Sequence, residues 1–261
     1  MPSPKDAPPP WITPDEARHA IAEGDGRGVR IAVLDSGIDR SHPQLAKLTI
    51  DDDIAILSEG GRINVRDSDE GDVFGHGTAV AGIIHALAPA ATIGSIRVLG
   101  HFKESRAAII REGVRQAAQR GYHIVQCSFG APARAQDAAL YKSWIDALYL
   151  RGMHLVAAGS NSGFQSAEWP AHFPTVIAVG SDPENRGELC AATGGLVELA
   201  SRGEEAAALW PGGGTRNLFG SSFAAPRAAA YLARLLGLHP GLSPLLAKAV
   251  LRQIALPGPA E

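Results

Sequence analysis

The chain has 261 residues, 45% of them hydrophobic, so it can build a sizeable core and lies near the upper size for one domain. A net charge of −3 without a long basic run gives no electrostatic reason to expect nucleic acid or an anionic membrane as partner. The sequence also lacks the run of about 18 apolar residues that a membrane-spanning helix requires.

The N-terminus and the cysteines bear on the cellular compartment. The opening residues, MPSPKDAPPP, contain no apolar segment typical of a secretory signal. The two cysteines, Cys127 and Cys190, match no zinc or disulfide-framework spacing, which fits a reducing compartment. We therefore expect a soluble cytoplasmic protein, although an extracellular protein without its presequence would have the same composition.

The N-terminal part divides into an arm and the start of a domain. Residues 1–10 are proline-rich and are expected to form a flexible or extended arm. Residues 11–261 contain no linker or internal repeat and are expected to form one domain. A helix is predicted over residues 13–23, because Pro14 suits the first helical position and acidic residues follow it.

A short apolar run and an acidic segment come next. Residues 30–34, RIAVL, are typical of a buried parallel strand, which ends at Asp35. Functional groups collect at the carboxyl ends of parallel strands, although Asp35 could equally hydrogen-bond its own turn. Residues 50–73 are acidic and contain glycine, and we predict a solvated irregular loop there.

Strands and helices alternate through the middle of the chain. This alternation predicts an α/β fold, a single domain with a mostly parallel central sheet and helices on both faces. The helix over 104–120 has its predicted apolar stripe in Ala108, Ile109, Ala117 and Ala118. The predicted strands span 92–98, 123–127, 153–158 and 175–179, and further helices span 134–151 and 243–254.

Two serines, Ser221 and Ser222, begin an amphipathic helix after a loop made flexible by glycines at 212–214. Free backbone N–H groups at a helix start stabilise developing negative charge, so a nucleophilic serine fits there. The alternative is a serine that only caps the helix. The nucleophile elbow of α/β-hydrolases is excluded, because its acid and histidine follow the serine and here only His239 and Glu261 remain.

His76 differs from the other histidines in its surroundings. The segment GHGTAVAGIIHAL places it between two glycines at the start of an apolar helix. The glycines leave the imidazole uncrowded, and the helix dipole favours a neutral resting base. The remaining histidines are expected to be structural.

Three motifs stand in a fixed order: VLDSGID around Asp35, GHGTAVAGII around His76 and GSSFAAP around Ser222. Together they resemble the subtilisin-like serine proteases, the subtilases, in which Asp, His and Ser occur in this order. The resemblance continues through nearly the whole chain from residue 11, in HPQL, IRVLG, IVQCSFGAP, AAGSNSG and WPAHFPTVIAVG.

The resemblance implies a role for each motif. Ser222 would attack a peptide carbonyl, His76 would take its proton and return it to the leaving amine, and Asp35 would orient His76. The Ser222 backbone N–H and the side-chain amide of Asn161 would stabilise the oxyanion.

Two substrate-binding segments are also implied by the resemblance. One would pair with an extended substrate backbone, and the other would form a wall of the pocket for the residue before the cleaved bond. The matching residues are Ser128, Phe129 and Gly130 for the first segment and Ala158, Gly159 and Ser160 for the second.

Glu168 falls where the family has the floor of that pocket. A carboxylate there would favour Lys or Arg before the scissile bond. The alternative is a surface-loop glutamate that points to water.

Several positions depart from the family pattern. Ser160 replaces a glycine in the oxyanion motif, and Gln44 replaces an aspartate that binds calcium in secreted relatives. The calcium-binding loop after the His76 helix is also missing, so we expect no metal site and no cofactor. HFKESR replaces the glycine-rich edge strand expected after IRVLG, which puts the outer binding groove in doubt.

The resemblance therefore predicts a serine endopeptidase that acts on a peptide or protein. Because the resemblance to the mature domain begins near residue 11, we expect folding without a propeptide and processing of a specific substrate. Two alternatives remain: a peptide macrocyclase or transpeptidase on the same fold, and a catalytically silent subtilase-like binding protein. The sequence predicts no oligomeric state.

Overall fold

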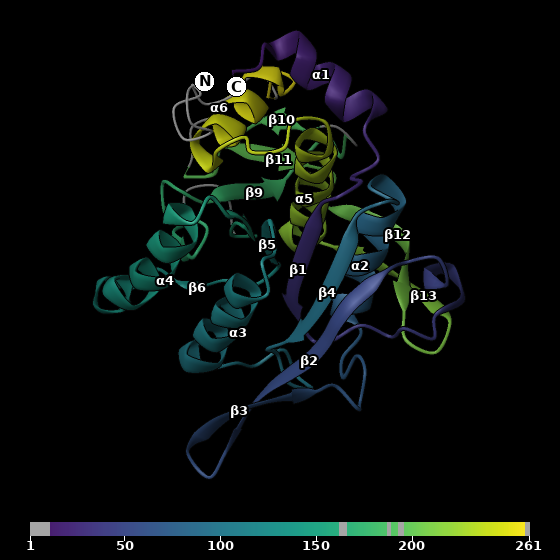
Figure 1. The fold of residues 1–261 in the computed structure, drawn as a ribbon, viewed down its shortest axis with the longest axis vertical. Coiled ribbons are helices and arrows are strands. Elements are labelled where there is room, and N and C mark those ends of the chain that lie inside the picture. Colours follow the sequence, from purple (N-terminus) through teal and green to yellow (C-terminus); the bar gives the residue numbers. More distant parts are fainter. Residues whose placement is uncertain (1–10, 162–165, 187–188, 193–195, 259–261) are drawn as a thin grey trace, which may run out of the picture.

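A computed structural model describes residues 11–161, 166–186, 189–192 and 196–258 (Figure 1). The predicted arm, residues 1–10, lies outside the described residues. Within them, no helix is both long and apolar enough to cross a membrane. The helices are α1 Pro14–Glu23, α2 His76–Leu87, α3 Ala107–Gln119, α4 Ala138–Leu150, α5 Ser221–Leu238 and α6 Pro244–Ile254.

The strands form one large sheet and two small ribbons. The large sheet has nine strands in the order β10-β11-β9-β7-β5-β1-β4-β2-β3, and every pair is parallel except β10 with β11 and β2 with β3 at its edges. The strands of this sheet are β1 Arg30–Asp35, β2 Ile50–Glu59, β3 Arg62–Asp67, β4 Thr92–Arg97, β5 Ile124–Cys127, β7 His154–Ala158, β9 Ile177–Ser181, β10 Cys190–Ala191 and β11 Leu199–Ser201. The ribbons are β12 Glu204–Trp210 with β13 Gly214–Phe219, and β6 Ala131–Pro132 with β8 Glu168–Trp169.

Helices cover both faces of the sheet, as predicted. Ile31 and Val33 of β1 pack on the face that holds α1, α2, α5 and α6. Ala32 and Leu34 point to the opposite face, which α3 and α4 cover (Figure 1). This alternation follows from the two-residue period of a strand, and it explains why β1 is apolar throughout.

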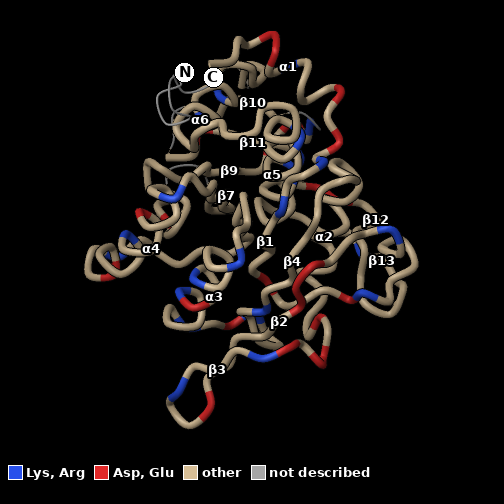
Figure 2. Tube along the Cα trace, viewed as in Figure 1, with Lys and Arg blue, Asp and Glu red and all other residues tan. Residues whose placement is uncertain are grey.

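The acidic segment 50–73 was expected to be a loop, and this prediction is wrong. It forms the antiparallel pair β2 and β3, joined by Gly60 and Gly61, whose φ angles of 56° and 78° suit a two-residue hairpin turn. Asp52 in β2 accepts hydrogen bonds from Arg120 at 2.6 Å and Tyr122 at 2.6 Å. Asp52 is therefore held within the strand by partners distant in sequence, and Figure 2 shows acidic residues near β2.

The other differences from the predicted elements are smaller. The helix predicted from residue 104 begins at Ala107, and Ala108 is exposed, while Ile110 and Val114 supply the buried stripe. The glycines at 212–214 lie at the turn between β12 and β13, and the Gly212 N–H donates to Asp39 at 2.8 Å. The glycine-rich approach to α5 is thus a hairpin anchored to the loop after β1.

The topology brings several functional candidates to one edge. Strands β1, β5 and β7 are parallel neighbours, so the ends of these strands meet at the same side of the sheet. Helices α2 and α5, which pack together, begin at that side with His76 and Ser221. The candidate functional residues are therefore gathered at the carboxyl edge of the sheet.

Candidate active site

Asp35 and His76 are brought together at the end of β1 and the start of α2. His76 Nδ1 lies 2.9 Å from each carboxylate oxygen of Asp35. The two residues are only 1% and 3% exposed. Because an ionised carboxylate can only accept, the Nδ1 atom carries the proton and the Nε2 atom of neutral His76 is left as the basic nitrogen.

The carboxylate of Asp72 joins the loop after Asp35 to the first turn of α2. Its Oδ1 atom accepts from the Ser36 hydroxyl at 2.8 Å and from the Gly75 backbone N–H at 2.6 Å. Its Oδ2 atom accepts from the backbone N–H of Thr78 at 2.8 Å and from the Thr78 hydroxyl at 2.6 Å. One carboxylate thus satisfies free donors of the helix start and fixes it against β1.

Ser36 completes this connection. Its backbone N–H donates to Asp35 Oδ1 at 2.8 Å, and its hydroxyl oxygen accepts from the Gly77 N–H at 3.1 Å. Asp72 is therefore connected to Asp35 through Ser36 and to His76 through the first turn of α2. Neither Asp72 nor Ser36 was predicted as a site residue, and the only sequence signal is an acid four residues before His76.

Ser222 lies in the first turn of α5 and is half-buried. Its hydroxyl donates to the Ser128 carbonyl oxygen at 3.0 Å, and the Ser128 hydroxyl donates to the Ser222 carbonyl oxygen at 2.6 Å. Among the hydrogen bonds of the described residues, none joins Ser222 to His76. The ring of Phe223 lies 5.3 Å from the His76 ring, so the starts of α5 and α2 are in contact.

Ser221 holds Asn161 beside Ser222. The Ser221 N–H donates to Asn161 Oδ1 at 2.7 Å, and the Ser221 hydroxyl donates to the Gly159 carbonyl oxygen at 2.6 Å. A Cβ atom on Gly220 would lie 3.1 Å from Asn161 Oδ1, and Gly220 has a φ of 124°, so both contact and conformation favour glycine. With Oδ1 occupied, the Nδ2 group of the exposed Asn161 remains as a donor.

The other predicted substrate-binding residues line the same edge. Residues 128–130 follow β5, and Ser128 is buried while Gly130 is exposed. Phe129 is partly buried and packs on the core that α3 and α4 cover. Ala158 ends β7, and both Ala158 and Ser160 are buried beside Gly159.

Glu168 lies against Gly130. It begins β8, which pairs with β6, the strand that follows Gly130. A Cβ atom on Gly130 would lie 2.5 Å from Glu168 Oε2, so the carboxylate sits directly over the Gly130 backbone. Glu168 is half-buried, and it has no ion-pair partner among the described salt bridges.

One predicted departure from the family pattern, the segment after IRVLG, can be located in the structure. Residues 98–106 form no strand, and Gly100 donates to the Glu104 carbonyl oxygen at 2.9 Å in a tight turn. Over the described ranges, no group of three or more His, Cys, Asp and Glu side chains is arranged to hold a metal ion.

Comparisons with known proteins identify the family. The subtilase family model matches residues 26–260. M-protease of Shouchella clausii (strain KSM-K16) is 30% identical over 90% of this chain and 61% of its own length. Subtilisin BL of Lederbergia lenta is 30% identical over 84% of this chain and 81% of its own length.

A solved structure agrees with these matches. The crystal structure of a cold adapted subtilisin-like serine proteinase matches with a TM-score of 0.70 and 26% identity, over 87% of this chain and 82% of that chain. The predicted α/β fold and the predicted class of subtilisin-like serine endopeptidase are confirmed. The chain spans about three fifths of M-protease and about four fifths of subtilisin BL.

The matches contradict the predicted cytoplasmic location and establish the family. The similar subtilisins and alkaline proteases are secreted extracellular enzymes, so the expectation of a cytoplasmic protein is wrong. A sequence without an apolar leader is typical of cytoplasmic proteins and of the mature domains of secreted proteins. This composition therefore did not distinguish the two locations. The chain belongs to the subtilase family of serine proteases.

Proposed function

We propose that this subtilase hydrolyses peptide bonds through Asp35, His76 and Ser222, with an acyl-enzyme intermediate. The observation that carries the proposal is the buried contact of both Asp35 oxygens with His76 Nδ1, at 2.9 Å each. This contact would leave Nε2 as the base at the edge where Ser222 lies in the first turn of α5. Residues 11–261 would form the one catalytic domain.

The reaction requires the Ser222 hydroxyl to turn from Ser128 towards His76. The Ser222 hydroxyl turns about a single side-chain torsion, and catalytic contacts of this kind often tighten only when substrate binds. Ser222 Oγ then bonds to the carbonyl carbon while its proton passes to His76 Nε2. The C–N bond breaks, the same proton goes to the leaving amine, and water releases the acyl group with Nε2 again as base.

Two donors would stabilise the oxyanion. The Ser222 backbone N–H belongs to the first turn of a helix, where N–H groups have no intrahelical partner. The Nδ2 group of Asn161 would be the second donor, because Ser221 holds the amide by its oxygen. The substrate backbone would lie along residues 128–130, with residues 158–160 as a wall of the pocket.

We further propose that Glu168 favours Lys or Arg before the scissile bond. Its carboxylate lies against Gly130 without a cation partner in the described residues, so a substrate cation would complete an ion pair. Cleavage of a peptide library should show Lys or Arg enriched at that position, and Glu168→Gln should remove the enrichment. Glu184→Gln, an exposed control, should retain it. Unbiased cleavage, or enrichment unchanged in Glu168→Gln, would contradict this assignment.

Peptide hydrolysis itself is tested with an unfolded protein substrate and mass spectrometry of the products. We expect new C-terminal carboxylates with the unchanged chain and none with Ser222→Ala. Products joined to an added amine would instead indicate a transpeptidase. Binding of the substrate without cleavage would indicate a silent binding protein.

A further inference from the structure

A cavity of about 350 Å³ lies on the outer face of α2, apart from the candidate active site. Its walls come from α2 and β12, with residues 44–45, Arg202 and Arg227 of α5 at the ends. None of its lining residues belongs to the Asp35, His76 and Ser222 set or to the predicted substrate-binding segments. The volume falls in the range of small-molecule sites.

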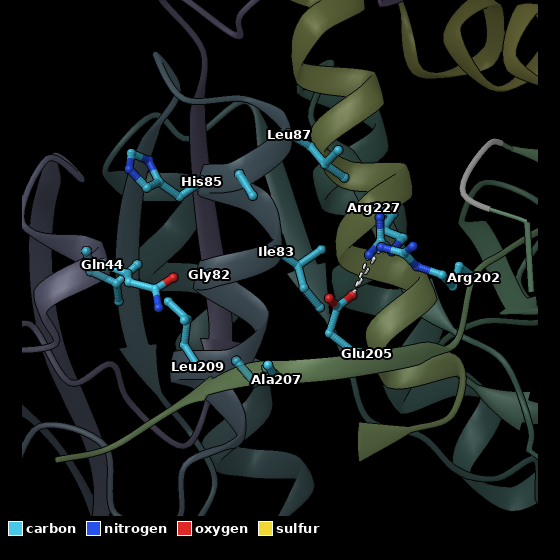
Figure 3. Close-up of a pocket in the computed structure, with 14 residues that line it drawn as sticks. Gln44, Gly82, Ile83, His85, Leu87, Arg202, Glu205, Ala207, Leu209 and Arg227 are labelled. Atoms are coloured by element: carbon cyan, nitrogen blue, oxygen red, sulfur yellow. Dashed lines mark hydrogen bonds and ion pairs between the residues drawn. The ribbon is translucent and has the colours of Figure 1, made fainter. Parts of the chain in front are cut away.

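The middle of the cavity is apolar. Ala79 and Ile83 of α2, Ala208 of β12 and Phe223 of α5 form one small buried cluster, with Leu87 packed against it. In Figure 3, Ile83 lies between two polar ends of the cavity. Gln44 and His85 form one end, and burial lowers the pKa of His85, which keeps that imidazole neutral. This part of the cavity suits an apolar body with neutral polar groups.

The opposite end carries an excess of positive charge. Arg227 is 5% exposed, and its guanidinium donates to Glu205 Oε2. Arg202 Nη2 lies 3.9 Å from the same oxygen. Figure 3 shows the two guanidinium groups and the carboxylate gathered together. Two cations therefore share one carboxylate, and the group keeps a net charge of about +1.

The hydrogen bonds of this cluster are also incomplete. The Nε atoms of Arg202 and Arg227 are both buried, and neither has a hydrogen-bond partner among the described residues. Buried charged groups are normally paired, and a guanidinium binds a carboxylate best through two parallel N–H donors. Glu205 alone cannot satisfy both side chains. A second anionic acceptor at the guanidinium groups would balance the charge.

We propose that this cavity binds a small molecule in which a carboxylate is attached to an apolar body. The carboxylate pairs with Arg202 and Arg227, and the apolar body lies against Ala79 and Ile83. The C-terminus of a peptide that ends in an apolar residue has this chemistry, and so does a free aliphatic acid.

The test uses N-acetyl-L-leucine and N-acetyl-L-leucinamide, which differ only in the carboxylate, titrated calorimetrically into the full chain. We expect the acid to bind at least ten-fold more tightly than the amide. 4-Methylpentanoate distinguishes the sources: binding equal to that of N-acetyl-L-leucine indicates a free acid, and weaker binding indicates a peptide C-terminus.

Two variants change the charge in opposite directions. Arg202→Gln should weaken binding of N-acetyl-L-leucine at least ten-fold, and this partly exposed residue can be replaced without removing a core side chain. Glu205→Gln should tighten binding, because it removes the competing carboxylate. Arg115→Gln on α3, at the opposite face of the sheet, should leave it unchanged. Equal binding of acid and amide, no binding of the acid, or affinities that neither Arg202→Gln nor Glu205→Gln alters would overturn the proposal.

Discussion

The two sides of the candidate active site are organised to different degrees. Asp35 and His76 are buried and joined through both carboxylate oxygens, and Asp72 fixes the elements that carry them. Ser222 is half-buried with its hydroxyl turned to the Ser128 carbonyl oxygen, and Asn161 is exposed. The proposed base is thus held in place before substrate arrives, whereas the hydroxyl of the proposed nucleophile must still turn. The hydrogen bonds that are already formed are those around His76, where a positive charge would develop on the imidazole.

Asp35→Asn disrupts the buried Asp35–His76 pair and should have the largest effect on activity. An amide in place of the carboxylate no longer enforces the Nδ1–H tautomer of His76, so Nε2 is lost as a base. We expect kcat to fall about 10⁴-fold, the magnitude known for the acid of serine-protease triads, including subtilisin of this family. Steady-state peptide hydrolysis measures it. Asp69→Asn, an exposed control, should keep full activity, and a loss under ten-fold for Asp35→Asn would contradict the assignment.

Asn161→Ala tests the more exposed side of the candidate site, which Ser222 and Asn161 form. Its Nδ2 group is the proposed side-chain donor to the oxyanion, and loss of the corresponding amide in subtilisin lowers kcat about 10²- to 10³-fold. We expect a similar fall in kcat with KM nearly unchanged, because the donor acts on charge present only in the transition state. Asn64→Ala on the exposed β3 should have no effect. A change confined to KM would assign Asn161 to ground-state binding.

Asp72→Ala removes hydrogen bonds that hold the start of α2, without changing a residue that would contact the substrate. The start of α2 loses the carboxylate that joins it to Ser36, and a displacement of about 1 Å can cost about 10²-fold in rate. We expect a 10- to 100-fold fall in kcat with KM unchanged. Asp72→Asn should recover part of the loss, because one oxygen can still accept from Gly75. Equal kcat in Asp72→Ala and the Asp69→Ala control would show that Asp72 does not position the start of α2 for catalysis.

His154 lies at the amino end of β7, opposite the candidate site, and should have the smallest effect on activity. Burial lowers its pKa from 6.5 to about 4. Between these values the unfolded chain takes up a proton that the folded chain does not, so stability is complete above about pH 6.5 and falls as the pH drops towards 4. The loss amounts to about 3 kcal/mol.

The measurement for His154 is urea unfolding at pH 7 and pH 4.5. His154→Gln should lose less stability over this interval than the unchanged chain does, whereas the exposed His19→Gln should behave like the unchanged chain. An identical loss in His154→Gln would show that His154 does not contribute to the pH dependence.

Local signals predicted the elements that depend on local chemistry. Thr13 and Glu16 form a capping box at the start of α1, and the apolar run of β1 is buried on both faces. The β2 and β3 hairpin was missed because its three consecutive acids read as a solvated loop. Two partners of Asp52, Arg120 and Tyr122, lie some 70 residues away, and only the fold brings them close.

Order along the chain predicted which residues would meet, but not how they are held. Asp35 and His76 were expected together and are found in contact. The hydrogen bonds of Asp72 could not be predicted, because they join a loop to a helix start and to Ser36 through the tertiary fold. The orientation of the Ser222 hydroxyl depends on one rotatable bond, which no sequence pattern specifies.

The central claim is that the Asp35–His76 pair activates Ser222 rather than its neighbour Ser221. Mass spectrometry after treatment with a fluorophosphonate tests it directly, with Ser221→Ala and Ser222→Ala as a matched pair. The account predicts one adduct on Ser222, retained in Ser221→Ala and absent from Ser222→Ala. An adduct on Ser221, or no adduct on a folded chain, would contradict the claim.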